Sequence, residues 1–273
     1  MSWQIALPLM LVVVAGFPHG AADGVLGLRL AARGGASLAI FTAAYLAIAG
    51  VVVLLWWVAP LAGFVFFLVL SVSHFGMMDT AATAHLPHRG PRVVMHGAAP
   101  IMVVPLVHGD AVTPIFSLLV GGEVAALIDL LQLAAPIWAL AVLWLALGQG
   151  AAGRRAAAEI AGLAVMLALL PPLWGFAVYF CAIHSVRHLR ALARALSPLG
   201  PRVWWQVAAF SAVSVAAVLA AVPWLATVDL DSGLIRATFI GLAALTVPHV
   251  LLIDVYGALK RVAPTLTPAK RGD

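Results

Sequence analysis

Long apolar stretches separated by short polar connections run along the whole chain. Nine of these stretches are long enough, or nearly so, to cross the hydrocarbon core of a bilayer as helices. They cover residues 3–22, 37–59, 61–80, 93–108, 124–147, 156–174, 175–196, 203–226 and 234–259. They lack the alternation of apolar and polar positions that is typical of barrel strands. The pattern predicts an all-α integral membrane protein, a bundle of eight or nine transmembrane helices.

The composition supports lipid as the solvent around most of the chain. Hydrophobic residues make up 64% of the sequence and charged residues 9%. So few charges cannot cover the surface of a soluble protein of 273 residues. In lipid, every backbone amide must be satisfied within the protein, and a helix does this within its own segment. We expect a single transmembrane domain over residues 1–260 and a basic cytoplasmic tail at 261–273.

Basic residues alternate between the connections. Arginines follow the first, third, fifth and seventh predicted spans, whereas acidic residues are more frequent in the intervening connections. The arginines are Arg29 and Arg33, Arg89 and Arg92, Arg154 and Arg155, and Arg194 and Arg202. Cytoplasmic connections are enriched in Lys and Arg, so nine spans place the N-terminus outside and the C-terminus in the cytoplasm. We expect a multi-pass protein of a bacterial or archaeal inner membrane.

Nine histidines are unusual in so apolar a chain. Ionisable groups within a membrane are costly, usually face the bundle interior, and commonly mark a functional site. The topology, set by Arg and Lys alone, places His19, His74, His184, His188 and His249 at a similar depth in the cytoplasmic half. His184 and His188 are four residues apart, so both imidazoles project from one helical face. An all-nitrogen site built from His19, His74, His184 and His188 would suit Fe, Cu, Zn or Ni.

The other four histidines give no such signal. We expect His85, His88 and His108 to be solvated, because they fall in or beside connections. His96 begins the fourth predicted span, and the sequence assigns no role to it.

Three of the histidines are followed by an aspartate four or five residues later. The segments are Pro18–Asp23, Ser73–Asp79 and Pro248–Asp254. A carboxylate beside a ligating imidazole fixes its tautomer and raises its basicity, so Asp23, Asp79 and Asp254 are expected to support the site. The alternative is that each aspartate ends its helix at the water boundary or pairs with a neighbouring Arg. Arg187 lies between His184 and His188, and we expect it to pair with one of these aspartates.

Aromatic residues close to the histidine motifs are candidates for lining an apolar substrate tunnel. They are Phe75, Trp174, Phe176 and Tyr179. Core packing is the more common use of such side chains, and it remains the alternative.

Four motifs together resemble a known family. They are PHGAAD at 18–23, SVSHFGMMD at 71–79, HSVRHLR at 184–190 and PHVLLIDVY at 248–256. In this order they resemble the bacteriorhodopsin-related-protein (Brp/Blh) family of membrane carotenoid dioxygenases, over residues 17–256. The resemblance implies an iron-dependent enzyme that uses O₂ to cleave β-carotene at its central 15,15′ double bond, giving two molecules of retinal.

The resemblance also implies roles for particular residues. The four histidines assigned to iron in the family correspond to His19, His74, His184 and His188, and Fe(II) is the expected cofactor. His249 matches a motif histidine, which we expect to neighbour the site without ligating. The expected partners are β-carotene and O₂ as substrates, the lipid bilayer, and a retinal-binding rhodopsin as product acceptor. No nucleic-acid partner is expected.

Other function classes stay open on the sequence alone. A membrane iron hydroxylase or desaturase would act on a different apolar substrate, but such enzymes usually need more ligands, in HxxHH and HxxxH clusters, and no adjacent His-His pair occurs here. A transporter would favour internal repeats, which are not evident. A non-enzymatic retinal- or haem-binding membrane protein is the remaining alternative.

Overall fold

The structure, a computed structural model, describes residues 2–34, 37–196, 200–255 and 257. These residues are helical nearly throughout, and no strand occurs among them, which confirms the predicted all-α class. The predicted tail at 261–273 lies outside the described residues.

The helical segments follow one another with short connections. In chain order they are α1 (Trp3–Leu11), η1 (Val12–Gly16), α2 (Pro18–Gly34), α3 (Leu38–Val58), α4 (Pro60–Asp79), η2 (Ala81–Thr83), α5 (Arg89–Val120), α6 (Ala125–Gly148), α7 (Gly150–Leu169), α8 (Pro172–Val178), η3 (Tyr179–His184), α9 (Ser185–Leu196), α10 (Arg202–Leu225), α11 (Leu230–Val250) and η5 (Leu251–Val255). The segments η1, η3 and η5 are single π-helical turns that continue or join α-helices, and π-turns of this kind are frequent at functional sites.

Seven helices in the described part of the chain are long and apolar enough to cross a membrane. They are Trp3–Arg29, α3, α4, α5, α6, α10 and Leu230–Asp254. Two further predicted spans coincide with α7 and with the run from α8 to α9. α7 carries Arg154, Arg155 and Glu159, and the second run is divided into three segments. A multi-pass membrane protein is therefore supported, while a count of eight or nine crossings stays a prediction.

α5 is longer than the hydropathy pattern predicted. A span was expected at 93–108, but the helix extends from Arg89 to Val120 and bends at His108, whose φ is −121° and ψ is 31°. The Nε2 of His108 donates a hydrogen bond to the Leu167 carbonyl at 3.2 Å. The expectation that His108 is solvated in a connection is therefore wrong. The polar run that begins at His108 lowered the local hydropathy without ending the helix.

Close packing of α4 against α5 fixes one side of the site. A Cβ on Gly76 would overlap the Val93 carbonyl, and a Cβ on Gly97 would overlap the Val72 carbonyl. Small residues allow such close approach between helices in a membrane.

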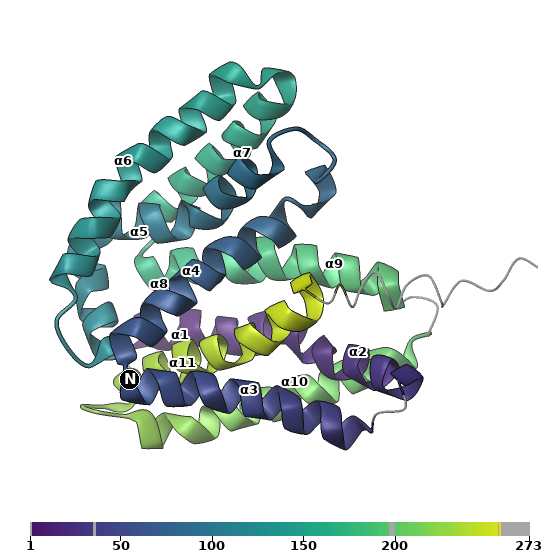
Figure 1. The fold of residues 1–273 in the computed structure, drawn as a ribbon. Coiled ribbons are helices and arrows are strands. Elements are labelled where there is room, and N and C mark those ends of the chain that lie inside the picture. The colour runs from purple at the N-terminus through teal and green to yellow at the C-terminus, as the bar shows by residue number, and fades with distance from the viewer. Residues whose placement is uncertain (1, 35–36, 197–199, 256, 258–273) are drawn as a thin grey trace, which may run out of the picture.

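The bundle has two sides with α4 and α11 between them. Helices α5, α6 and α7 pack together on one side, and α2, α3 and α10 pack on the other (Figure 1). Among the seven candidate spans, the one that contains α11 is the most buried. The side chains of His74 and Asp79 on α4 and of Thr238 and His249 on α11 are buried, so they lie inside the protein and not against lipid.

Candidate histidine site

Four histidines meet inside the bundle. The ring centroid of His74 on α4 lies 5.0 Å from that of His184 on η3 and 4.9 Å from that of His249 on α11. The ring centroids of His249 and His188 on α9 are 5.1 Å apart. All four side chains are buried. The structure therefore brings His74, His184 and His188 together, as the sequence predicted, and places His249 beside them, where a neighbour of the site was expected.

Three of these imidazoles are held by aspartates. In each pair Nδ1 of the ring donates to a carboxylate oxygen: His74 to Asp254 at 2.9 Å, His184 to Asp79 at 3.3 Å, and His249 to Asp23 at 2.9 Å. An imidazole protonated at Nδ1 carries its lone pair on Nε2. The aspartates thus select the tautomer that presents Nε2 as the metal-binding or hydrogen-bond-accepting atom.

Each aspartate bonds a histidine from a motif other than its own. Asp254 follows His249 in the sequence but bonds His74, and Asp79 follows His74 but bonds His184. These bonds tie α4 to η3 and to the end of α11. The sequence spacing could not reveal this exchange, because it reports only which side chains share one helix.

The position of His19 is only partly described. It is the second residue of α2, but its side chain lies outside the described residues. Among the described side chains, no group of three or more His, Cys, Asp or Glu is arranged to hold one metal ion. The four-histidine ligand set therefore stays a prediction.

A second polar network surrounds Asp79. The Tyr179 hydroxyl donates to Oδ2 of Asp79 at 2.8 Å, and Nδ1 of His96 lies 3.8 Å from the same oxygen. The Nε2 of His96 donates to Oε1 of Glu159 at 3.2 Å. Arg187 pairs with Glu159 and donates to the backbone carbonyl of Asp79 at 3.0 Å.

This network corrects one prediction and adds two residues. Arg187 was expected to pair with a site aspartate, but its carboxylate partner is Glu159, because α7 packs against α5 beside the site. Glu159 and His96 were given no role by the sequence. The available signals were a lone glutamate in an apolar stretch and a histidine at the start of a span.

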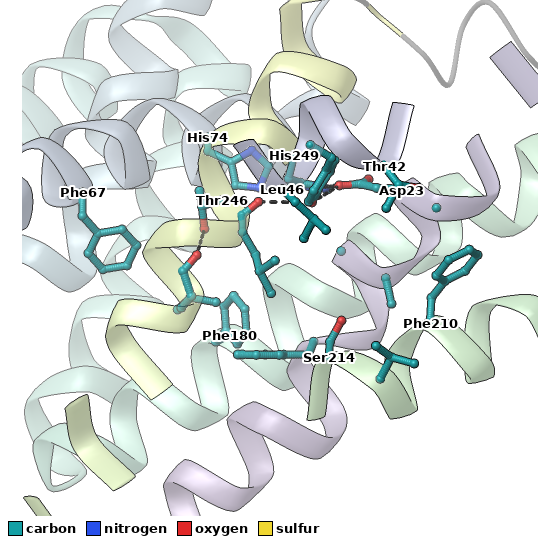
Figure 2. A pocket seen from close by; sticks show the side chains of 18 of the residues that line it. Asp23, Thr42, Leu46, Phe67, His74, Phe180, Phe210, Ser214, Thr246 and His249 are labelled. Carbon is teal, nitrogen blue, oxygen red and sulfur yellow. Dashed lines mark hydrogen bonds and ion pairs between the residues drawn. The ribbon is translucent and has the colours of Figure 1, made fainter. Parts of the chain in front are cut away.

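A mostly apolar cavity of about 310 Å³ adjoins the histidine cluster. His74 and His249 line it together with Asp23 and Tyr45, and the Tyr45 hydroxyl donates to Oδ2 of Asp23 at 2.9 Å. Figure 2 shows His74 and His249 side by side in the cavity wall, with Asp23 joined to His249. The aromatic residues that line this cavity are Tyr45, Phe17, Phe41, Phe67, Phe75, Phe180 and Phe210. An apolar ligand placed here would contact two rings of the cluster.

The predicted tunnel residues fall in different places. Phe75 lines this cavity and a second, smaller one, and Phe176 lines only the second. Tyr179 is fully buried and bonded to Asp79. Trp174 is not among the residues that line either cavity.

Comparison with known proteins places these motifs in a family. Residues 10–256 match the family model described as beta-carotene 15,15′-dioxygenase. The chain belongs to the beta-carotene 15,15′-dioxygenase family. The match spans all four motifs and confirms the resemblance that they indicated.

A curated member of the dioxygenase family is similar over nearly the full length. The protein named beta-carotene 15,15′-dioxygenase from uncultured marine bacterium 66A03 is 33% identical over 260 residues, which cover 90% of this chain and 91% of the relative. No solved structure matches the chain.

Proposed function

We propose that this protein cleaves β-carotene with O₂ at the central 15,15′ double bond and releases retinal. Family membership supports the reaction. The observation that carries the proposal is the position of His74 and His249, two members of a buried histidine cluster, in the wall of an otherwise apolar cavity. A polyene could bind in this cavity against the groups proposed to hold the reactive centre.

We propose Fe(II) as the cofactor, held by His19, His74, His184 and His188. The Nε2 of His74 is buried and has no hydrogen-bond partner among the described residues, while Nδ1 is occupied by Asp254. Buried polar nitrogens rarely lack a partner, so a ligand at this atom is expected. Two imidazoles that share one ion at about 2.1 Å have ring centroids roughly 5 Å apart. The separation of 5.0 Å between the His74 and His184 rings fits this arrangement.

The chain's own residues would set the electrostatics of this site. Iron bound here would supply the centre at which O₂ is activated. The proposed ligands are all neutral imidazoles. Asp23, Asp79 and Asp254, which bond Nδ1 atoms of the histidine cluster, would provide negative charge to compensate that of the iron. His249 is held by Asp23 against the rings of His74 and His188, and we propose that it positions these groups without ligating.

The apolar substrate is proposed to reach the cavity from the bilayer. Leu46 on α3 and Val213 on α10 both line the cavity, and 61% and 68% of these residues are exposed. The cavity therefore extends to the outer surface of the bundle between these two membrane-spanning helices. A carotenoid dissolved in lipid could enter there without crossing water, and the aromatic lining would exclude water from the reacting bond.

Orientation, location and product transfer are part of the same proposal. We place the N-terminus outside and the C-terminus in the cytoplasm of a bacterial or archaeal inner membrane, following the arginine pattern. Retinal keeps the apolar polyene and ring of its precursor and so stays in the bilayer, and a retinal-binding rhodopsin in the same membrane is the proposed acceptor.

Expression in a β-carotene-accumulating bacterium tests the function. Wild type should bleach the cells and yield retinal by chromatography of the extract, and His188→Ala should do neither. His85→Ala is the matched control, because His85 is exposed in the connection before α5 and should behave as wild type. Unchanged carotene in cells that contain folded, iron-supplied wild-type protein would reject the proposal.

A further inference from the structure

A second cavity lies next to the first. It measures about 90 Å³ and is lined almost entirely by apolar side chains of α4, α5, α8 and α11. Phe67, Ser71 and Phe75 line both cavities and so form the wall between them. We call these three residues the shared wall.

The shared wall continues from the histidine cluster along α4. Phe67, Ser71 and His74 are spaced four and three residues apart, so they lie on one face of the helix. Ser71 is buried, and its hydroxyl has no hydrogen-bond partner among the described residues. A buried hydroxyl without a partner is unfavourable, so packing alone does not account for Ser71. Its side chain is smaller than those of Phe67 and Phe75 on either side of it in the shared wall.

The two cavities extend in different directions from the histidines. Figure 2 shows Phe67 and Phe210 on opposite sides of the His74 and His249 pair. Phe210 lines only the first cavity, whereas Phe67 belongs to the shared wall, beyond which the second cavity lies. The site thus has apolar space on both sides of the proposed reactive centre.

The length of the second arm matches half of the proposed substrate. Phe64 lines the far side of the second cavity and lies ten residues before His74 on α4, about 15 Å along the axis at a rise of about 1.5 Å per residue. β-Carotene is about as long as the hydrocarbon core is thick, roughly 30 Å, so each half measures roughly 15 Å.

We propose that the second cavity is the binding subsite for one half of the symmetric polyene, while the first cavity holds the other half. This inference rests on the proposed function and deepens it. At about 90 Å³ the second cavity is too small alone, because ligand pockets usually begin near ~300 Å³. Phe67 must therefore turn aside to join the two volumes when substrate binds. With one half of the polyene in each cavity, the central double bond lies beside His74, which would account for cleavage at the middle of a chain that has no polar group to fix its register.

Filling the second cavity tests the proposal. Val104 on α5 lines this cavity, whereas Val107 on the same helix does not and is 49% exposed. Val104→Phe and the matched control Val107→Phe are compared as purified, iron-supplied full-length protein on two substrates. One substrate is β-carotene, and the other is an apocarotenal with one complete half and a shortened second half.

We expect Val104→Phe to lose activity on β-carotene but not on the apocarotenal. Val104→Phe should lower retinal formation from β-carotene roughly tenfold or more, while cleavage of the apocarotenal stays near wild type, because the shortened half does not reach the filled space. Val107→Phe should leave both rates unchanged. If Val104→Phe loses activity equally on both substrates, or on neither, this inference is overturned. The proposed function still stands in that case, provided that wild type forms retinal. Absence of retinal from wild type overturns both.

A second variant decides the matter if Val104→Phe is not monodisperse. Phe67→Leu thins the shared wall with a small change in volume and should leave the fold intact. The polyene should then bind in more than one position relative to the reactive centre, and the variant should yield apocarotenals of unequal length beside retinal. Retinal as the sole cleavage product of this variant would overturn the proposal.

Discussion

The Nδ1 of His74 donates to Oδ2 of Asp254 at 2.9 Å, although 180 residues separate the two in the sequence. The bond joins α4 to η5, the π-helical turn that ends the α11 run. It is one of three bonds in which an aspartate from one motif holds a histidine from another. The site is therefore an interlocked unit, and loss of one aspartate is expected to weaken a histidine on a different helix.

Replacement of Asp254 by Asn is expected to weaken iron binding. The amide keeps the size of the carboxylate but removes the negative charge that orients and polarises the His74 ring. Loss of such a partner typically costs about 10–100-fold in metal affinity or activity. Iron content and retinal formation are measured on purified Asp254→Asn and on Asp110→Asn, an exposed aspartate on α5. Equal iron affinity in both variants would show that the His74–Asp254 bond has no role in metal binding.

Replacement of His249 separates ligands from neighbours. In the proposed ligand set His249 does not bind iron, so His249→Ala should keep most of the iron that wild type carries. Its activity should still fall, because the rings of His74 and His188 lose the side chain packed against them. His188→Ala should lose both iron and activity. If His249→Ala loses iron to the same degree as His188→Ala, then His249 is a ligand and the proposed set is wrong.

The close contact between α4 and α5 should be sensitive to one added methyl group. Gly97→Ala would push a Cβ into the Val72 carbonyl and force the two helices apart, with an expected loss of about 1–3 kcal/mol. Gly90→Ala, on the same helix, meets no described atom within 4 Å and should be neutral or slightly stabilising. The midpoint of thermal unfolding in detergent compares the two. Identical midpoints would show that the helices do not approach as closely as described.

Much of this site could be predicted from the sequence. The four-residue spacing of His184 and His188, the long apolar context and the alternating arginines were enough to bring these histidines together with His74. Membrane burial of a histidine is costly, so such residues are few and their grouping is informative. The all-α fold followed from the same apolar pattern.

Other features depend on how helices pack, which spacing does not encode. Each aspartate bonds a histidine of another motif, as Asp254 bonds His74. Which histidine it bonds depends on how α4 and the α11 run are rotated relative to each other. Glu159 enters the site only because α7 packs against α5. The short polar run that begins at His108 lowers the local hydropathy but does not prevent helical hydrogen bonding. α5 therefore continues past His108 to Val120. These distinctions arise from tertiary contacts and not from local pattern.

Removal and return of iron tests the central claim most directly. Purified wild-type protein is treated with a chelator, assayed with β-carotene under air, and assayed again after Fe(II) is restored. We predict that retinal formation stops on chelation, resumes with Fe(II), and yields two molecules of retinal for each β-carotene consumed. Cleavage that continues unchanged without iron, or restored activity that gives only apocarotenals of unequal length, would contradict an iron-dependent central cleavage at this histidine site.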